Sequence, residues 1–130
     1  MKKVIITTVA LLSMVAGAAV VSAEPKQTDT SFTKEMVSGK TMVSSAYKAG
    51  SVTFNEGGTL TCNGYPKVVE CKTWEIDPDG AIVRYFVDNS SGAPKPVRAV
   101  WKLIKNNGTS FRVIQTSSNS DKTSEIIVSY

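Results

Sequence analysis

FNEGGTLTCNGYPKVVECKTWEIDPDGAIVRYF, residues 54–86, is the stretch that decides the fold. Three turn signals, Glu56-Gly57-Gly58, Asn63-Gly64-Tyr65-Pro66 and Asp77-Pro78-Asp79-Gly80, divide it into short segments of alternating apolar and polar residues. Proline presets φ for a turn, aspartate bonds to nearby backbone, and glycine accepts positive φ, so each signal predicts a chain reversal. Segments joined by such tight reversals are expected to pair as neighbouring antiparallel strands.

The same pattern continues on both sides of this stretch. From residue 36 onward, short segments rich in Val, Ile, Thr and aromatic residues are separated by Gly, Asn, Pro and Asp at intervals of roughly ten residues. No segment has the length and period of a helix. We therefore predict an all-β fold, an antiparallel up-and-down barrel or a strongly curved sheet of seven to eight strands, with an OB-like barrel or a two-sheet sandwich as the alternative. The predicted strands are 41–47, 51–55, 59–62, 67–76, 81–88, 97–104, 109–117 and 124–130.

The alternation also predicts which side chains point inward. Val69 and Cys71 share one parity whereas Trp74 and Ile76 share the other, so a bulge is expected between Cys71 and Trp74. In a later segment the alternation places Trp101 on the apolar face.

The strand AIVRYFVD, residues 81–88, is apolar on both faces. Ile82 and Phe86 lie on one side, and three apolar or aromatic residues lie on the other. A strand of this kind is expected to be central in the sheet or covered on both sides.

The aromatic residues either fill the core or line a pocket, and the sequence alone does not decide between these two interpretations. Filling is the favoured interpretation, because the interior of a small barrel is normally packed with side chains. If a pocket exists, Trp74, Tyr85 and Trp101 are the candidate ligand-binding residues. Any ligand is then expected at one open end or at the loops 89–96 and 117–123.

The chain begins with MKK, an apolar run from Val4 to Val21, and small residues before Glu24. These features are typical of a bacterial secretory signal peptide. A transmembrane anchor is the alternative, but polar residues and a glycine dilute the run, and a span needs about 20 strongly apolar residues. We therefore expect cleavage after Ala23, a periplasmic or secreted protein, and no stable membrane anchor.

Cleavage of residues 1–23 would leave a chain long enough for one small domain. Residues 24–35, EPKQTDTSFTKE, are mostly polar and show neither helical nor alternating periodicity, so we predict a flexible leader. Phe32 is expected to be exposed to solvent and not packed against the domain, because a lone apolar residue in a polar segment is usually exposed. Residues 36–130 then form a single antiparallel β domain. Loss of the two lysines of the MKK start lowers the net charge from +4 to +2. No basic cluster longer than a pair remains, which argues against nucleic acid as a partner.

Cys62 and Cys71 are the only two cysteines. In an exported protein an even pair predicts a disulfide, here across the Asn63-Gly64-Tyr65-Pro66 reversal. Two free thiols or a metal-binding pair are the alternatives. A metal site is poorly supported, because the chain contains no histidine to complete a zinc-binding set.

Catalytic chemistry has little support in the sequence. The absence of histidine removes the commonest general base and nucleophile activator, so we predict that the protein is not an enzyme and carries no cofactor. The one concentration of carboxylates could be a calcium loop or an acid/base pair, but it lacks the spacing of an EF-hand. An ordinary turn with a solvated face is the simpler interpretation. These carboxylates are Glu70, Glu75, Asp77 and Asp79.

The text SVTFNEGGTLTCNG…KTWEIDPDGAIVR, between Ser51 and Arg84, resembles small bacterial lipocalin-like, calycin-type β-barrel domains. In those domains a G-K/T-W start is followed by a tFn-dGt turn and a W-x-i-d-dG hairpin. Gly39-Lys40-Thr41 agrees with that start, although Met42 stands where Trp is common. The resemblance covers about half of the chain that would remain after cleavage. It implies a barrel or half-barrel that binds something at its mouth or loops, and it supplies no functional residues.

Three classes of function remain. The first is a lipocalin-like, non-enzymatic binding module for a small apolar or amphipathic ligand, favoured by the barrel and the aromatic residues. The second is a module that binds a protein of the cell envelope or the exterior, such as an inhibitor or a virulence accessory protein. An enzyme is the least favoured.

Overall fold

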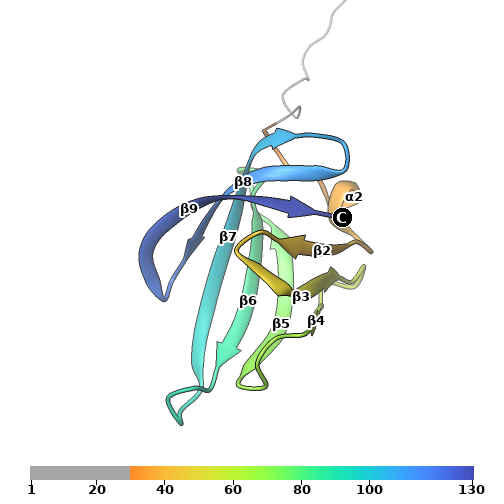
Figure 1. The fold of residues 1–130 in the computed structure, drawn as a ribbon. Helices are drawn as coiled ribbons and strands as arrows, with labels where there is room; N and C mark the ends of the chain where they lie inside the picture. The colour runs from red at the N-terminus through yellow and green to blue at the C-terminus, as the bar shows by residue number, and fades with distance from the viewer. Residues whose placement is uncertain (1–29) are drawn as a thin grey trace, which may run out of the picture.

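The structure is a computed structural model that describes residues 30–130, so the predicted signal peptide and the first part of the leader lie outside the described residues. Eight strands form one antiparallel sheet that curls into a nearly closed barrel (Figure 1). The predicted all-β barrel is confirmed. No helix in this part of the chain has the length and hydropathy needed to cross a bilayer. The elements are α2 (Lys34–Val37), β2 (Thr41–Ser44), β3 (Tyr47–Phe54), β4 (Leu60–Asn63), β5 (Val69–Ile76), β6 (Ile82–Asp88), β7 (Lys95–Asn106), β8 (Ser110–Ser117) and β9 (Ser120–Ser129).

The strand order is β4-β3-β2-β9-β8-β7-β6-β5. The first and last strands of the sheet in sequence, β2 and β9, therefore pair with each other through Val43–Ser129 and Ser44–Val128. The two sheet edges are β4 and β5, which are consecutive in the chain. The first reversal lies at Ser45-Ala46, inside the predicted strand 41–47, so Tyr47 belongs to β3.

β4 and β5 were expected to form a hairpin, and the structure corrects this. The residues just before β4 meet β5 at one isolated bridge, between Thr59 and Thr73, and at one hydrogen bond in which Trp74 N–H donates to the Gly58 carbonyl at 2.9 Å. The strong twist and curvature of a small barrel carry the two edges past each other, so a full ladder does not form. This contact between sheet edges is called the seam below.

A disulfide between Cys62 on β4 and Cys71 on β5 crosses the seam, as predicted. The two Cα atoms are 6.1 Å apart, which lies within the usual range for disulfides. The bond therefore joins covalently two strands that share few backbone hydrogen bonds.

The predicted bulge is confirmed, because the register of β5 against β6 shifts between Cys71 and Thr73. Trp74 and Trp101 both point inward, with 4% and 1% of their surface exposed. Together with apolar residues from the other strands they fill the barrel core. Its fully buried side chains include Val37, Met42, Val52, Phe54, Ile82, Trp101, Phe111, Val113 and Val128.

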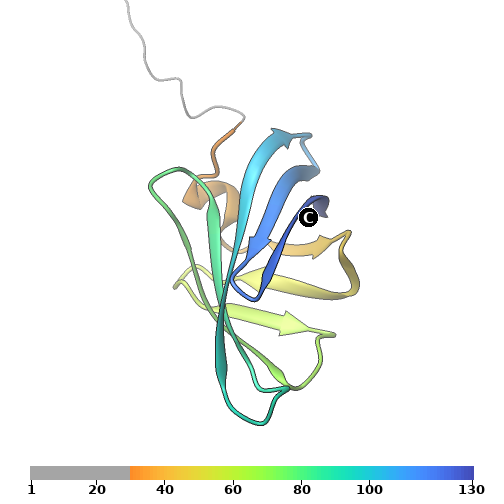
Figure 2. The same cartoon turned by 90° about the vertical axis from the view of Figure 1, so that its left-hand side faces the viewer.

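One end of the barrel is closed by the N-terminal segment, and this corrects the expectation that Phe32 is exposed. Phe32 is 2% exposed and packs edge-on against Phe111, with ring centroids 5.0 Å apart. Its N–H donates to the Gly80 carbonyl at 2.7 Å. Gly80 has φ +82°, and a Cβ there would lie 2.6 Å from that of Ser31, so glycine permits the close approach. Figure 2 shows this segment and α2 beside the loop that joins β5 to β6.

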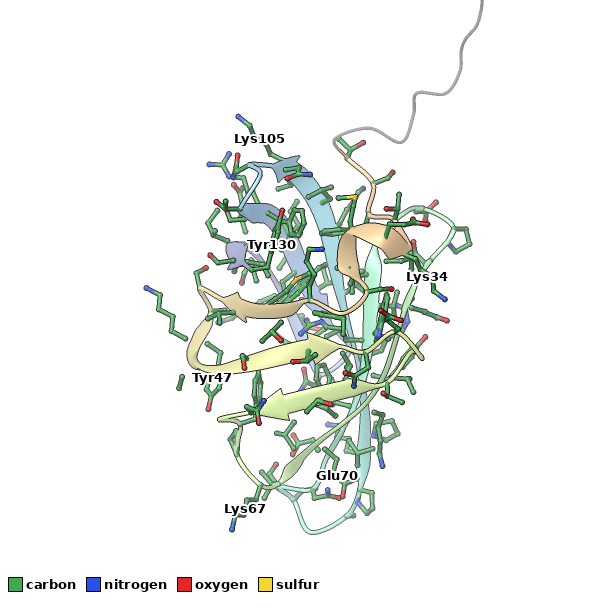
Figure 3. All side chains as sticks on the ribbon, turned by 90° about the vertical axis from the view of Figure 1, so that its right-hand side faces the viewer. Lys34, Tyr47, Lys67, Glu70, Lys105 and Tyr130 are labelled. Atoms are coloured by element: carbon green, nitrogen blue, oxygen red, sulfur yellow. A yellow bond between two sulfur atoms is a disulfide. The ribbon has the colours of Figure 1, made fainter. Side chains whose placement is uncertain are left out.

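The opposite end of the barrel carries the loops after β4 and after β6. Figure 3 places Lys67 and Glu70 at this end, and Lys105 at the other. The candidate site lies at this open end, where the loop after β4 contributes Tyr65 to its lining.

Candidate functional site

A cavity of about 410 Å³ opens between the strand ends at the open end of the barrel. Strands β2, β3, β5, β6, β7, β8 and β9 contribute to its lining, and so does the loop after β4. In an up-and-down barrel, alternate residues of every strand face the axis, so successive inward residues stack in layers.

The floor is formed by Arg84, Trp101 and Gln115, from three neighbouring strands. The guanidinium carbon of Arg84 lies 3.9 Å from the ring centroid of Trp101, and 5.3 Å from that of Phe86. The indole N–H of Trp101 donates to Gln115 Oε1 at 2.8 Å, and Arg84 Nη2 donates to the same oxygen at 3.4 Å. One amide oxygen therefore orients both the indole and the guanidinium.

Arg84 is a buried cation without a carboxylate partner. Its side chain is 5% exposed, and its Nε is buried with no hydrogen-bond acceptor within the described residues. The two ion pairs found in residues 30–130 are Lys72–Glu70 and Arg112–Glu125, and neither includes Arg84. Burial lowers the pKa of Arg84 to about 10, which still leaves the guanidinium charged at neutral pH.

Apolar side chains form the wall above the floor. Phe86 stands two residues after Arg84 on β6, and its register partner is Val97. Ala99 is the register partner of Arg84, and its small side chain leaves space in the cavity beside the guanidinium. Ser117 continues this layer on β8, opposite Ala99. The middle of the cavity is therefore mostly apolar, with a hydroxyl on one side.

Two tyrosines stand at the rim. Tyr47 and Tyr65 pack with ring centroids 4.7 Å apart, and the Tyr47 hydroxyl donates to the Gly64 carbonyl at 3.0 Å. A Cβ on Gly50 would lie 2.7 Å from the Tyr65 ring, so the glycine makes room for it. Burial raises the pKa of Tyr65, which therefore stays a neutral phenol at physiological pH. Figure 3 shows Tyr47 between Tyr130 and Lys67 along the height of the molecule.

Asp88, at the end of β6, also borders the rim. Its carboxylate accepts a hydrogen bond from Ser90 N–H at 2.9 Å, and hydrogen bonds from Ser90 lower the pKa of Asp88. Lys95 is its register partner and lowers that pKa further. Asp88 is therefore hydrogen-bonded within its own loop and lies close to the positive charge of Lys95.

The three aromatic residues named from the sequence occupy different places. Trp101 lines the cavity. Trp74 lies in the core, where it meets Phe54 edge-on at 5.5 Å and donates from its indole N–H to the Asn55 carbonyl at 2.8 Å. Tyr85 is not among the lining residues, and its hydroxyl donates to Glu75 Oε2 at 2.9 Å.

Sequence reasoning missed Arg84 as a site residue. The signal was present, because Arg84 stands between Ile82 and Phe86 with the same parity, and a period of two puts all three on one face.

The concentration of carboxylates does not form a metal site in the described region. Residues 30–130 contain no cluster of three or more His, Cys, Asp or Glu side chains placed to hold a metal ion. Asp77 Oδ1 instead accepts from the N–H groups of Asp79 at 2.9 Å and Ala81 at 3.0 Å. This is the side-chain capping expected of a turn.

No protein-family model, curated protein or solved structure matches the chain. The resemblance to lipocalin-like domains therefore stays a prediction.

Proposed function

We propose that this protein is a non-enzymatic binding module that takes a small amphipathic molecule into the cavity at the open end of its barrel. The observation that carries the proposal is the cavity itself, with its apolar wall above a polar floor. Its volume of about 410 Å³ falls within the range of about 300–1,000 Å³ typical of small-molecule sites. Such sites combine mostly apolar walls with a few polar groups that orient the ligand.

The distribution of polar groups favours an amphipathic ligand over a purely apolar one. A hydrocarbon would cover the guanidinium of Arg84 and the amide of Gln115 without giving either a hydrogen bond. Covering polar groups in this way costs free energy. A ligand with a polar head and an apolar body would match both the floor and the wall formed by Phe86, Val97 and Ala99.

The proposal includes a periplasmic or secreted location in a bacterium. The disulfide between Cys62 and Cys71 is compatible with an oxidising compartment. The signal-like residues 1–23 support export.

Tryptophan fluorescence tests the binding proposal, because the two tryptophans report on different places. In the Trp74→Phe variant, Trp101 is the remaining indole and contacts the cavity; in the Trp101→Phe variant, the remaining indole is Trp74 in the core. Decanol, decanoate and N-phenyl-1-naphthylamine serve as probes. We expect at least one probe to change the emission of Trp101 but not that of Trp74, and to raise Tm progressively as its concentration increases above Kd.

If none of the three probes changes the Trp101 emission or Tm, the binding proposal is wrong. The protein-interaction module would then be the remaining candidate. An equal response of both tryptophans to decanol or decanoate, which do not absorb tryptophan emission, would show that the probe disturbs the whole core and does not occupy the cavity.

A further inference from the structure

The strongest unexplained feature of the cavity is the charge at its floor. A guanidinium has five N–H donors and no acceptor. For Arg84 the described residues supply one hydrogen bond, to Gln115 at 3.4 Å, and Nε has none. A buried cation left in this state is costly, and buried charges in proteins are normally paired.

Stacking on Trp101 does not remove this deficit. The guanidinium carbon lies 3.9 Å from the indole ring centroid, so one face of the guanidinium makes a cation–π contact. The N–H donors lie in the guanidinium plane, so contact with its face leaves the edge donors unpaired. Trp101 and Gln115 thus hold the guanidinium in position while its edge remains available.

The cavity surroundings favour an anion and disfavour a cation. Tyr65, the ionisable side chain whose charge bears on Arg84, is neutral at physiological pH. Asp88 is bonded to Ser90 and forms no ion pair with Arg84. The floor therefore presents one net positive charge in an apolar enclosure, where electrostatic interactions are strong.

We propose that Arg84 is the anchor for the carboxylate of the ligand, so that the bound molecule is a small amphipathic carboxylic acid lying head-down in the cavity. This rests on the proposed binding function and specifies its ligand class. A planar carboxylate can accept two parallel hydrogen bonds from the edge of a guanidinium. The apolar body would then lie against Phe86, Val97 and Ala99 and point toward the rim.

Three decyl compounds that differ only in the head group test this assignment by isothermal titration calorimetry: decanoate, decanol and decyltrimethylammonium. With the unaltered protein we expect decanoate to bind about 10- to 100-fold more tightly than decanol, because a hydrogen-bonded charge pair adds to the same apolar contact. Decyltrimethylammonium is expected to bind more weakly than decanol.

The Arg84→Met variant should remove the preference for decanoate over decanol, because the charged hydrogen-bond donor is lost while the apolar wall is kept. Arg98→Met is the matched control, because Arg98 lies on β7 but is exposed and is not among the lining residues. It should preserve the preference. Retention of the preference in Arg84→Met would overturn the assignment.

The outcomes separate this inference from the binding proposal. If decanol and decanoate bind equally well to the unaltered protein, the cavity binds amphipathic molecules but Arg84 is not the anchor. If none of the decyl compounds binds, the binding proposal itself fails. Should Arg84→Met not fold, the comparison of the three compounds on the unaltered protein decides.

Discussion

The buried charge of Arg84 lowers the stability of the folded protein, and a role in ligand binding would explain why the residue is there. Burial disfavours its charged form, as the lowered pKa of about 10 indicates. Because the folded-state pKa lies below the ordinary value of 12.5, this cost is fully present at pH 7 and is relieved only as pH rises through about 10.

The first prediction follows from this cost. Arg84→Met should raise the free energy of unfolding of the ligand-free protein by about 1 kcal/mol, since desolvation of a buried ion exceeds the roughly 2 kcal/mol of a desolvated cation–π contact. Urea unfolding at pH 7 measures it. Arg98→Met, on the surface, should change the value by less than about 0.5 kcal/mol. A loss of stability in Arg84→Met would mean that stacking on Trp101 outweighs the cost of burial.

The second prediction concerns pH. Binding of decanoate should be constant between about pH 6 and about pH 9, because carboxylates of this kind titrate near 4–5 and Arg84 stays charged. Tyr65 and Asp88 do not titrate in this window, since the pKa of Tyr65 is raised and that of Asp88 is lowered. Below it, protonation of the ligand should weaken binding. Calorimetric titrations at several pH values, with decanol as the pH-independent reference, check this. A midpoint inside the window would point to another group.

Single residues show how far the sequence alone could lead. The inward orientation of Trp101 followed from alternation, and the bulge after Cys71 followed from the change of parity. Alternation also places Arg84 on the inward face of its strand. It was not predicted as a site residue, because charged residues are rarely buried and an arginine is expected to be exposed. Phe32 was missed for a different reason. Its partner, Phe111, is far away in the sequence, so nothing near Phe32 indicates the contact.

At the level of elements, the seam is the weak part of the barrel. Each of the other neighbouring strand pairs shares a ladder of at least two register partners, whereas β5 pairs with the residue just before β4 at one bridge. The residues between Cys62 and Cys71 include Tyr65 and Val69, which line the cavity. The disulfide therefore supports both the seam and part of the cavity lining.

The third prediction tests this double role. Reduction of the Cys62–Cys71 bond should lower the free energy of unfolding by about 2–3 kcal/mol, which corresponds to a decrease in Tm of about 10 °C or more. Calorimetry with and without a reductant measures the change. In the reduced protein, still folded at low temperature, decanoate should bind more weakly while keeping its preference over decanol. A Cys62→Ala/Cys71→Ala variant controls for effects of the reductant, and an unchanged Tm in both would contradict the role of the bond.

For the whole molecule, the regular part of the fold could be predicted and its closure could not. Turn chemistry and alternation are local, so all eight strands appear in the predicted places to within a few residues. The pairing of β2 with β9 joins the two ends of the domain, and no local signal specifies it. The cavity depends on that closure together with side-chain sizes such as that of Ala99, which explains why alternation alone favoured a filled interior.

The fourth prediction concerns the form in which the protein works. We expect the exported chain to start at Glu24, because the small residues before it fit a signal peptidase site. Intact mass spectrometry of protein recovered from periplasm or medium measures the start. Retention of residues 1–23 would contradict export through cleavage. An Ala23→Pro variant, which should block the cut, provides a precursor for comparison.

The position of the seam also decides what a single cut in the chain would do. Lys67 is exposed in the short loop between Cys62 and Cys71, where trypsin could reach it. Because the break in the sheet and the covalent bridge are in the same place, a chain nicked after Lys67 would stay one covalent molecule with all its ladders intact. It should gain the mass of one water, remain folded, and separate into two fragments only when it is reduced and denatured. Cleavage after Lys67 would thus give a folded barrel made of two polypeptides linked by the Cys62–Cys71 disulfide. The two chain termini created by the cut would lie beside the mouth of the cavity.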